Sequence, residues 1–291
     1  MNNRCIDFVL HHKNGINELV KLEMEYCVAY EKLHRRYYSK LTSRHYEENQ
    51  NEPLTRIVWW CWLQGEEAAP PLCKACLASM REHLPEYEIR VVTLQNMLEF
   101  VHLPQFILDK YERGIISRTH FSDILRTLLL IEYGGVWIDS TVYCTGYNVP
   151  IFEYPLFVYQ NWKLKISQTM VASSWLISAR KNDPILCAVR DLLFAYWNEN
   201  DSLLNYFLFH FFFKMAAEHY FEHWKAVPRF SNTPPHILQR EIFDVYDEER
   251  FKQIKQMADF HKLSYKCNTE GRNLTGSYYD KIVMHSEEGV L

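Results

Sequence analysis

The sequence lacks the compositional features of several protein classes. No tract rich in Gly or Pro divides its 291 residues, and we find no internal repeat and no low-complexity stretch. A chain of this length is ample for one large core, and 48% hydrophobic with 23% charged residues is ordinary for a globular protein. The simplest expectation is a single domain with an N-terminal addition.

A strong positive charge and a long apolar run are also absent. The formal net charge of -4 argues against a nucleic-acid-binding groove, which needs clustered Lys and Arg. The most apolar run, 203–213, has about half of the ~20 residues that a membrane-spanning helix needs, so we predict a core helix there. The N-terminal residues are mixed rather than apolar, unlike a signal peptide. We therefore expect a cytoplasmic protein, and peripheral association with the inner membrane face stays open.

Closely spaced cysteines occur once among the eight cysteines of the chain. Cys73 and Cys76 have no second pair and no His pair at the spacing that a zinc site requires. We interpret them as two half-buried thiols on one helix.

Hydrophobic periodicity predicts alternating strands and helices. Residues 16–48 are expected to form one or two charged amphipathic helices. The predicted strands are 56–63, 87–93, 136–138, 156–159, 171–178 and 261–266, and the predicted later helices include 71–84, 106–112, 184–198, 203–221 and 247–258. Strands that alternate with helices indicate the α/β class.

The stretch 122–141 is the most informative part of the chain. It predicts a helix that carries Asp123 and Arg126 on one face, a stop at Gly134 and Gly135, and a short apolar strand that ends on Asp139. In open α/β sheets, ligands bind at the carboxyl ends of the strands. An isolated Asp and Arg at this spacing can also be a solvated ion pair worth about 0.2–0.5 kcal/mol, but the coupling to a strand that ends in a carboxylate favours a ligand site.

These motifs resemble the sugar-nucleotide site of glycosyltransferases with a DXD-containing sugar-binding region. The closer resemblance is to the bacterial capsular polysaccharide synthesis glycosyltransferases. The blocks that carry it run in family order and are 58–65, Pro70-Pro71, 120–123, 234–238 and 261–266. The resemblance implies a GT-A-like, Rossmann-type nucleotide-sugar-binding domain at residues 51–291. Residues 1–50 lie outside the resemblance, and their periodicity predicts a helical N-terminal extension.

The resemblance assigns the catalytic set to Asp123, Arg126 and Asp139. In the resembled enzymes the Asp and Arg of the helix contact sugar hydroxyls, and the first Asp of the strand-end motif contacts ribose and metal. Ser140 and Thr141 complete this motif, and we expect them beside the donor.

The end of the first strand is a second expected part of the donor site. By resemblance, Trp62, Gln64 and Gly65 contact the nucleoside base and the ribose. The alternative is that the aromatic side chains around Cys61 simply fill a core.

The cofactor that the resemblance implies is Mn²⁺ or Mg²⁺, held by carboxylates together with the donor's phosphates. Asp139-Ser140-Thr141 carries a hydroxyl where the resembled motif has its second carboxylate. A hydroxyl is a much weaker ligand, so the metal requirement stays open. His261 resembles the C-terminal metal or phosphate ligand of such folds, and the alternative is a structural histidine.

The function that the resemblance implies is hexose transfer from a nucleotide sugar, with a UDP-sugar as the expected donor. The expected acceptor is a hydroxyl of a capsular or other surface polysaccharide intermediate, such as a lipid-linked oligosaccharide. We expect retention of anomeric configuration, and the sequence shows no paired carboxylates of the glycosidase kind. The alternative is a non-catalytic nucleotide-sugar-binding or scaffold subunit. The missing second Asp permits this alternative, and the presence of both Asp123 and Arg126 disfavours it.

Overall fold

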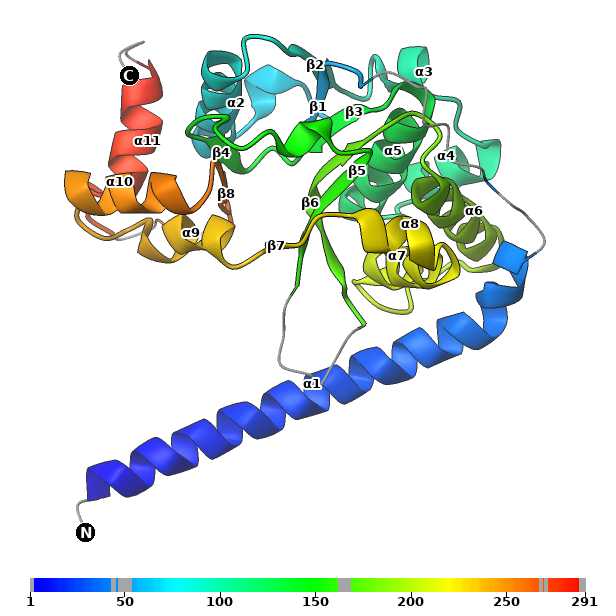
Figure 1. Cartoon of the computed structure of the whole chain (residues 1–291), viewed down its shortest axis with the longest axis horizontal. Helices are drawn as coiled ribbons and strands as arrows, with labels where there is room; N and C mark the ends of the chain where they lie inside the picture. Colours follow the sequence, from blue (N-terminus) through cyan, green and yellow to red (C-terminus); the bar gives the residue numbers. More distant parts are fainter. Residues whose placement is uncertain are drawn as a thin grey trace.

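A six-stranded mixed sheet forms the centre of the protein in the computed structural model, which describes residues 3–42, 46, 54–161, 169–266, 269 and 272–287 (Figure 1). The sheet contains β1 (Ile57–Cys61), β2 (Glu88–Val92), β3 (Gly135–Ile138), β5 (Leu156–Gln160), β6 (Ala172–Ala179) and β7 (Phe230–Ser231). Their order is β2-β1-β3-β6-β5-β7. The first three strands are parallel, and β6 runs antiparallel to its neighbours β3 and β5. β4 (Val142–Cys144) and β8 (Phe260–Lys262) form a separate antiparallel pair.

Helices cover both faces of this sheet (Figure 1). The α-helices are α1 (Asn3–Thr42), α2 (Pro71–His83), α3 (Met97–Phe100), α4 (Gln105–Glu112), α5 (Arg118–Tyr133), α6 (Pro184–Glu199), α7 (Leu208–His219), α8 (Phe221–Ala226), α9 (Ile237–Glu241), α10 (Glu248–Met257) and α11 (Tyr278–Glu287). Short 3-10 helices are Glu66–Ala68, Ile151–Glu153 and Pro234–His236. The predicted α/β class is therefore confirmed, and its parallel half β2-β1-β3 is the Rossmann-type part expected of a GT-A-like domain.

The side chains of each strand divide between two cores because successive residues point to opposite faces. Trp59 of β1 and Trp137 of β3 are buried against α4, α5, α6 and α7. Val58 and Trp60 of β1 are buried on the other face with α2. A third cluster joins the far side of α2 to α9, α10 and α11. The carboxyl ends of the parallel strands stay uncovered by either layer and can accept a ligand.

The connection from α5 to β3 depends on Gly135. Its φ is +90°, and a Cβ at this position would lie 2.5 Å from the carbonyl oxygen of Ile57. The close approach of β3 to β1 therefore requires glycine, and it fixes where the strand ends on Asp139.

The predicted N-terminal helix is present as α1, which extends away from the sheet at its N-terminal end (Figure 1). Near its other end, Tyr30 and Tyr37 are buried, with rings in edge contact with Phe211 and Phe212 of α7. The predicted domain boundary at residue 50 lies outside the described residues and stays a prediction. Among the described residues, no helix combines the length and apolarity needed to cross a bilayer.

Three predicted elements are wrong at their ends. The helical segment expected from residue 16 already begins at Asn3, as α1. The helix expected at 203–221 begins only at Leu208, because the Asn205 side chain accepts a hydrogen bond from the N–H of Phe207 at 2.9 Å and forms a turn instead. The strand expected at 261–266 ends at Lys262, followed by a turn at Tyr265 and Lys266.

Candidate functional site

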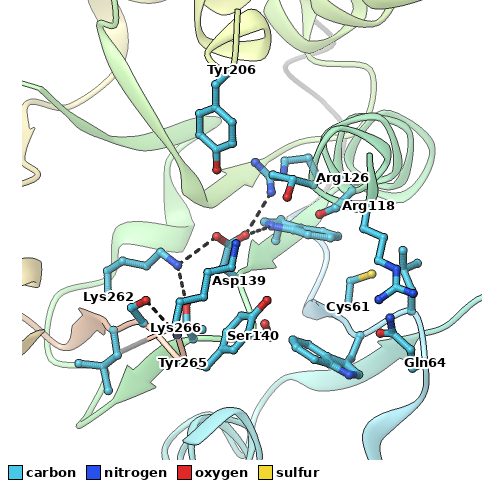
Figure 2. Close-up of a pocket in the computed structure, with 18 residues that line it drawn as sticks. Cys61, Gln64, Arg118, Arg126, Asp139, Ser140, Tyr206, Lys262, Tyr265 and Lys266 are labelled. Atoms are coloured by element: carbon cyan, nitrogen blue, oxygen red, sulfur yellow. Dashed lines mark hydrogen bonds and ion pairs between the residues drawn. The ribbon is translucent and has the colours of Figure 1, made fainter. Parts of the chain in front are cut away.

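A cavity of about 350 Å³ opens at the carboxyl ends of β1 and β3 (Figure 2). Its wall is formed by residues 61–64 at the end of β1 and by one side of the N-terminal turns of α5. Trp137, the motif 139–141, Tyr206 and residues 262–266 complete the wall. Five separate segments of the chain thus meet at the sheet edge where the sequence predicts a ligand site.

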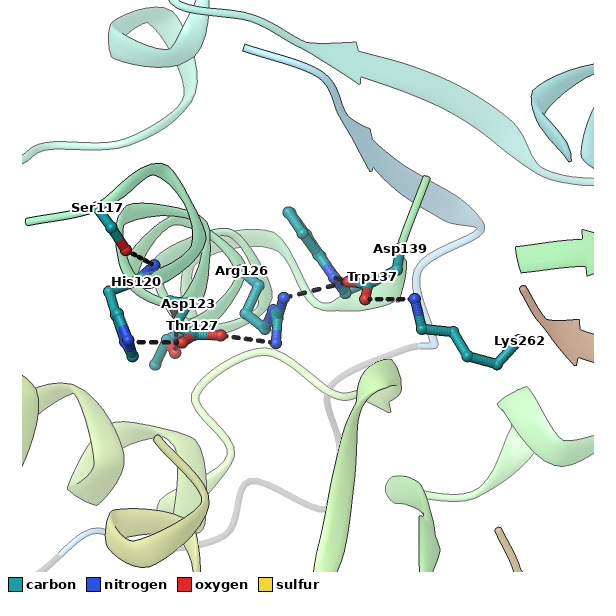
Figure 3. Close-up of polar contacts among 8 residues, drawn as sticks. All are labelled: Ser117, His120, Asp123, Arg126, Thr127, Trp137, Asp139 and Lys262. Atoms are coloured by element: carbon teal, nitrogen blue, oxygen red, sulfur yellow. Dashed lines mark hydrogen bonds and ion pairs between the residues drawn. The ribbon is translucent and has the colours of Figure 1, made fainter. Parts of the chain in front are cut away.

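Asp139 lies at the centre of a polar network in this cavity (Figure 3). Its Oδ1 accepts hydrogen bonds from Trp137 Nε1 at 2.9 Å and from Arg126 Nη2 at 3.2 Å. Its Oδ2 lies 3.3 Å from Lys262 Nζ. The N–H of Asp139 donates to the carbonyl of Trp175 at 2.8 Å, so the backbone is held as firmly as the side chain.

The charge of Asp139 is stabilised by these neighbours. Burial raises the pKa of the Asp139 carboxyl, but the charges of Lys262 and Arg126 and the hydrogen bonds from Trp137 and Lys262 outweigh burial, so this pKa stands below its ordinary value. Asp139 is therefore a carboxylate at neutral pH, fixed in orientation and able to accept a hydrogen bond from a ligand hydroxyl.

Arg126 connects Asp139 to α5 (Figure 3). Its Nη1 lies 2.9 Å from Asp123 Oδ1, and its guanidinium lies 5.0 Å from the ring centroid of Trp137. Arg126 lines the cavity, whereas Asp123 does not. Asp123 is 6% exposed and also lies 3.4 Å from the ring of His120. Asp123 therefore holds Arg126 from behind the cavity wall, and its expected contact with the sugar stays a prediction.

The end of β1 forms the opposite wall. Trp62 and Gln64 line the cavity, and the ring of Trp62 is in edge contact with Tyr265 at a centroid distance of 5.4 Å. With its amide oxygen turned toward Arg118, Gln64 accepts from Arg118 Nε at 3.3 Å. Gly65 does not line the cavity. It has φ +94°, and its N–H donates to the carbonyl of Trp62 at 2.9 Å, so it shapes the turn that presents the other two.

His261 does not line the cavity, so the structure gives its predicted role as a metal ligand no support. The side chain is fully buried, with Nε2 3.1 Å from Thr145 Oγ1. Burial lowers the pKa of His261 to about 4, against a smaller opposite effect of Asp259, so the ring is neutral at pH 7. Its neighbour Lys262 reaches the cavity instead, since adjacent residues of a strand point to opposite faces.

The sequence prediction missed several cavity residues. Lys262 and Lys266 stand in the block 261–266, where only the histidine was singled out. Strand alternation is the signal that separates the two neighbours, because a buried His261 places Lys262 on the other face. Tyr206 carried no signal, because its segment was predicted to be helical. Figure 2 shows its hydroxyl directed toward Arg126 and Asp139.

The predicted Ser140 and Thr141 do line the cavity. Thr141 Oγ1 accepts a hydrogen bond from Lys262 Nζ. In the part of the chain that the structure describes, no three His, Cys, Asp or Glu side chains gather in an arrangement that could hold a metal ion. Of the described residues that line the cavity, Asp139 alone carries a carboxylate.

Known proteins resemble the chain to different extents. The "Inositol phosphoceramide mannosyltransferase 3" of Schizosaccharomyces pombe is 26% identical over 148 residues, which are 50% of this chain. The match spans only 38% of the length of that relative. The solved structure "PaToxG Glycosyltransferase" aligns with 89% of this chain and 95% of its own, at 13% identity and a TM-score of 0.42.

The family comparison covers nearly the whole chain. Residues 12–282 match the family described as "Capsular polysaccharide synthesis protein". This span includes α5, the strand-end motif and β8, as the resemblance found in the sequence does, and it also includes residues 12–50, which that resemblance left out. The chain therefore belongs to the capsular polysaccharide synthesis protein family.

Proposed function

We propose that the protein is a glycosyltransferase that moves a hexose from a nucleotide sugar to a hydroxyl of a surface polysaccharide intermediate. Family membership and the partial match to a relative named as a mannosyltransferase support this proposal. A UDP-sugar is the first donor to test, and a glycan or lipid-linked oligosaccharide is the proposed acceptor. The proposed setting is the cytoplasmic side of a membrane.

The observation that carries the proposal is the charge balance around Asp139. The cavity wall contains four basic side chains, Arg118, Arg126, Lys262 and Lys266, and one carboxylate. Such a wall suits a dianionic diphosphate, and the fixed carboxylate suits hydroxyl groups of ribose or sugar. A nucleotide sugar presents both kinds of group within one molecule.

Two aromatic side chains of the cavity wall form the proposed binding place of the nucleoside base. Trp62 and Tyr265 stand together at the cavity, and Tyr265 is 41% exposed. An aromatic ring of this kind can stack on a base, which is worth about 1–3 kcal/mol in nucleic-acid complexes. Arg126 and Asp139 would then hold the sugar end, and we propose retention of configuration, with the acceptor hydroxyl approaching from the side the diphosphate leaves.

Thermal stabilisation by a panel of nucleotide sugars tests the proposed donor class. A ligand that binds only the folded state stabilises it by RT ln(1 + [L]/Kd), about 2.7 kcal/mol at a hundredfold excess over Kd. We expect a UDP-sugar to raise the melting temperature, and Tyr265→Ala to reduce this shift. Tyr154→Ala is the matched control, because Tyr154 is 38% exposed and lies away from the cavity. No shift with any nucleotide sugar would contradict the proposal.

A further inference from the structure

Lys262 occupies the strand-end motif where the family resemblance implies a divalent cation. Its Nζ lies 3.3 Å from Asp139 Oδ2 and donates a hydrogen bond to Thr141 Oγ1 (Figures 2 and 3). One ammonium group therefore bridges the first and third positions of the motif. The third position is the one that has a hydroxyl in place of the second carboxylate.

The oxygen atoms of this motif do not fit a divalent cation. Mg²⁺ demands near-octahedral oxygen ligands at about 2.0–2.1 Å. Oδ1 of Asp139 already accepts two hydrogen bonds, from Trp137 and Arg126, and Oδ2 faces the ammonium of Lys262. A cation beside this carboxylate would meet two fixed positive charges at short range, which is unfavourable. Among the described residues of the cavity wall, Asp139 supplies the only carboxylate, so the protein offers a cation no second carboxylate to offset these charges.

The position of Lys262 is fixed by the backbone. β8 pairs with β4 so that Lys262 stands opposite Val142, and the N–H of Leu263 donates to the carbonyl of Thr141 at 2.8 Å. The β4–β8 pair thus ties Lys262 directly to the motif. Its side chain is 21% exposed, far less than that of a surface lysine such as Lys252, at 52%. The ammonium is a preorganised charge at the cavity wall, which is the property that makes electrostatic stabilisation effective.

The ammonium also keeps capacity for a ligand. Lys carries three N–H donors, and Asp139 and Thr141 take two of them. Lys262 lines the cavity, so the third donor is available to an anion there. Lys266 and Arg118 line the same cavity and add positive charge at two further places.

We propose that Lys262 takes the place of the divalent cation, so that this protein binds and cleaves its donor without a metal ion. This inference rests on the proposed transferase function. In the transfer, the acceptor oxygen bonds to the anomeric carbon, and the bond from that carbon to the β-phosphate oxygen breaks with both electrons going to the oxygen. The hydroxyl proton is taken up by the released diphosphate. Lys262 counters the negative charge that grows on the leaving oxygen.

Calorimetric titration with UDP, GDP and inorganic pyrophosphate tests the inference. For the wild-type protein we expect a Kd in EDTA within about threefold of the value in Mn²⁺ or Mg²⁺. Lys262→Met should weaken binding in EDTA by at least about tenfold, equivalent to about 1.4 kcal/mol. Lys262→Arg keeps the charge and should bind within a few-fold of wild type. Lys252→Met, on the exposed face of α10, is the matched control and should bind like wild type.

A double variant tests the replacement directly. Lys262→Ala combined with Thr141→Asp removes the ammonium and restores a second carboxylate. Its binding of UDP should become dependent on Mn²⁺, weak in EDTA and at least about tenfold tighter with the metal. This variant remains informative if Lys262→Met alone fails to fold.

The outcomes separate this inference from the proposed function. If the wild-type protein binds UDP or GDP only with Mn²⁺ or Mg²⁺, the lysine does not replace the cation, and the transferase proposal stands. If none of the three probes binds in either condition, the transferase proposal fails and the inference fails with it.

Discussion

At the scale of single residues, the proposed activity depends most on Asp139. Asp139→Asn removes the negative charge that faces Arg126 and Lys262, and it leaves one amide oxygen as an acceptor where the carboxylate has two. We predict that Asp139→Asn lowers donor turnover by at least about a hundredfold, the order of loss seen when a preorganised electrostatic group is removed. The fold should remain, as checked by circular dichroism. Turnover within a few-fold of wild type would remove Asp139 from the active site.

Asp123 should act through stability rather than through contact with the ligand. Asp123→Ala leaves the buried guanidinium of Arg126 with one carboxylate partner, Asp139. We predict a loss of about 3 kcal/mol in the free energy of unfolding, measured with urea, because a buried charge has lost a partner. Glu66→Gln, which breaks the more exposed pair with Arg81, should cost under about 1 kcal/mol. Equal losses in the two variants would contradict this role.

Asp139 could be predicted from the sequence because one local pattern, an apolar strand ending in a carboxylate, identified it. Lys262 could not be predicted in this way, because its role depends on the pairing of β8 with β4, and these two strands are far apart in the sequence. His261 was chosen for its chemistry as a ligand type. Its neutral, buried state follows only from the packing of that strand pair.

At the scale of elements, the link between α5 and β3 depends on Gly135. Gly135→Ala places a Cβ 2.5 Å from the Ile57 carbonyl oxygen at a φ of +90°. We predict a loss of about 2–3 kcal/mol in unfolding free energy. Backbone strain accounts for about 1–3 kcal/mol, and the clash adds to it because it moves β3. Gly114→Ala also has a positive φ but meets nothing within 4 Å, so it should cost less, about 1 kcal/mol. A larger loss at Gly114 would contradict this account.

The strand pair β4–β8 should make stability depend on pH. The pKa of His261 is about 4 in the folded protein and about 6.5 in an unfolded chain. The unfolded state therefore takes up the proton first, so the contribution of His261 is complete above about pH 6.5 and is lost as pH falls toward about 4, by roughly 3 kcal/mol. His210, whose pKa is also about 4, adds a similar effect.

His261→Gln tests this contribution separately from ligand binding. Denaturant unfolding between pH 7 and pH 4 should show a shallower loss of stability in the variant than in the wild-type protein. UDP affinity should stay unchanged at neutral pH, because His261 does not line the cavity. A loss of UDP affinity without loss of stability would restore His261 to the ligand site.

Most elements could be predicted, because their periodicity is local. β1, α2, β3 and α6 stand within about two residues of their predicted ends. The start of α7 could not be predicted, because the apolar run continues the helical pattern through the turn that Asn205 forms. That turn is the reason Tyr206 lies over the cavity rather than on a helix. β4 was missed because three residues after a motif carry no period.

At the scale of the whole molecule, the fold brings five distant segments to one sheet edge, one of which is the turn that carries Tyr206. The parallel strands β1 and β3 supply two of them, α5 supplies the arginines, and β8 supplies the lysine. The sequence predicts the class of the fold, the segments of β1, α5 and β3, and the block 261–266, in which it selected His261 rather than Lys262. It does not predict the turn at Tyr206. Packing between α2 and the C-terminal helices places β8 and its Lys262 at this edge. No local sequence pattern predicts that packing.

Release of nucleoside diphosphate from a panel of nucleotide sugars, with and without a glycan acceptor, is the measurement that tests the account most directly. We expect slow release of nucleoside diphosphate from one sugar nucleotide alone and faster release when the acceptor is added. Asp139→Asn should lose both the slow and the accelerated release. Binding of a nucleotide sugar with no cleavage under any condition would contradict it, and would show a non-catalytic binding or scaffold subunit instead.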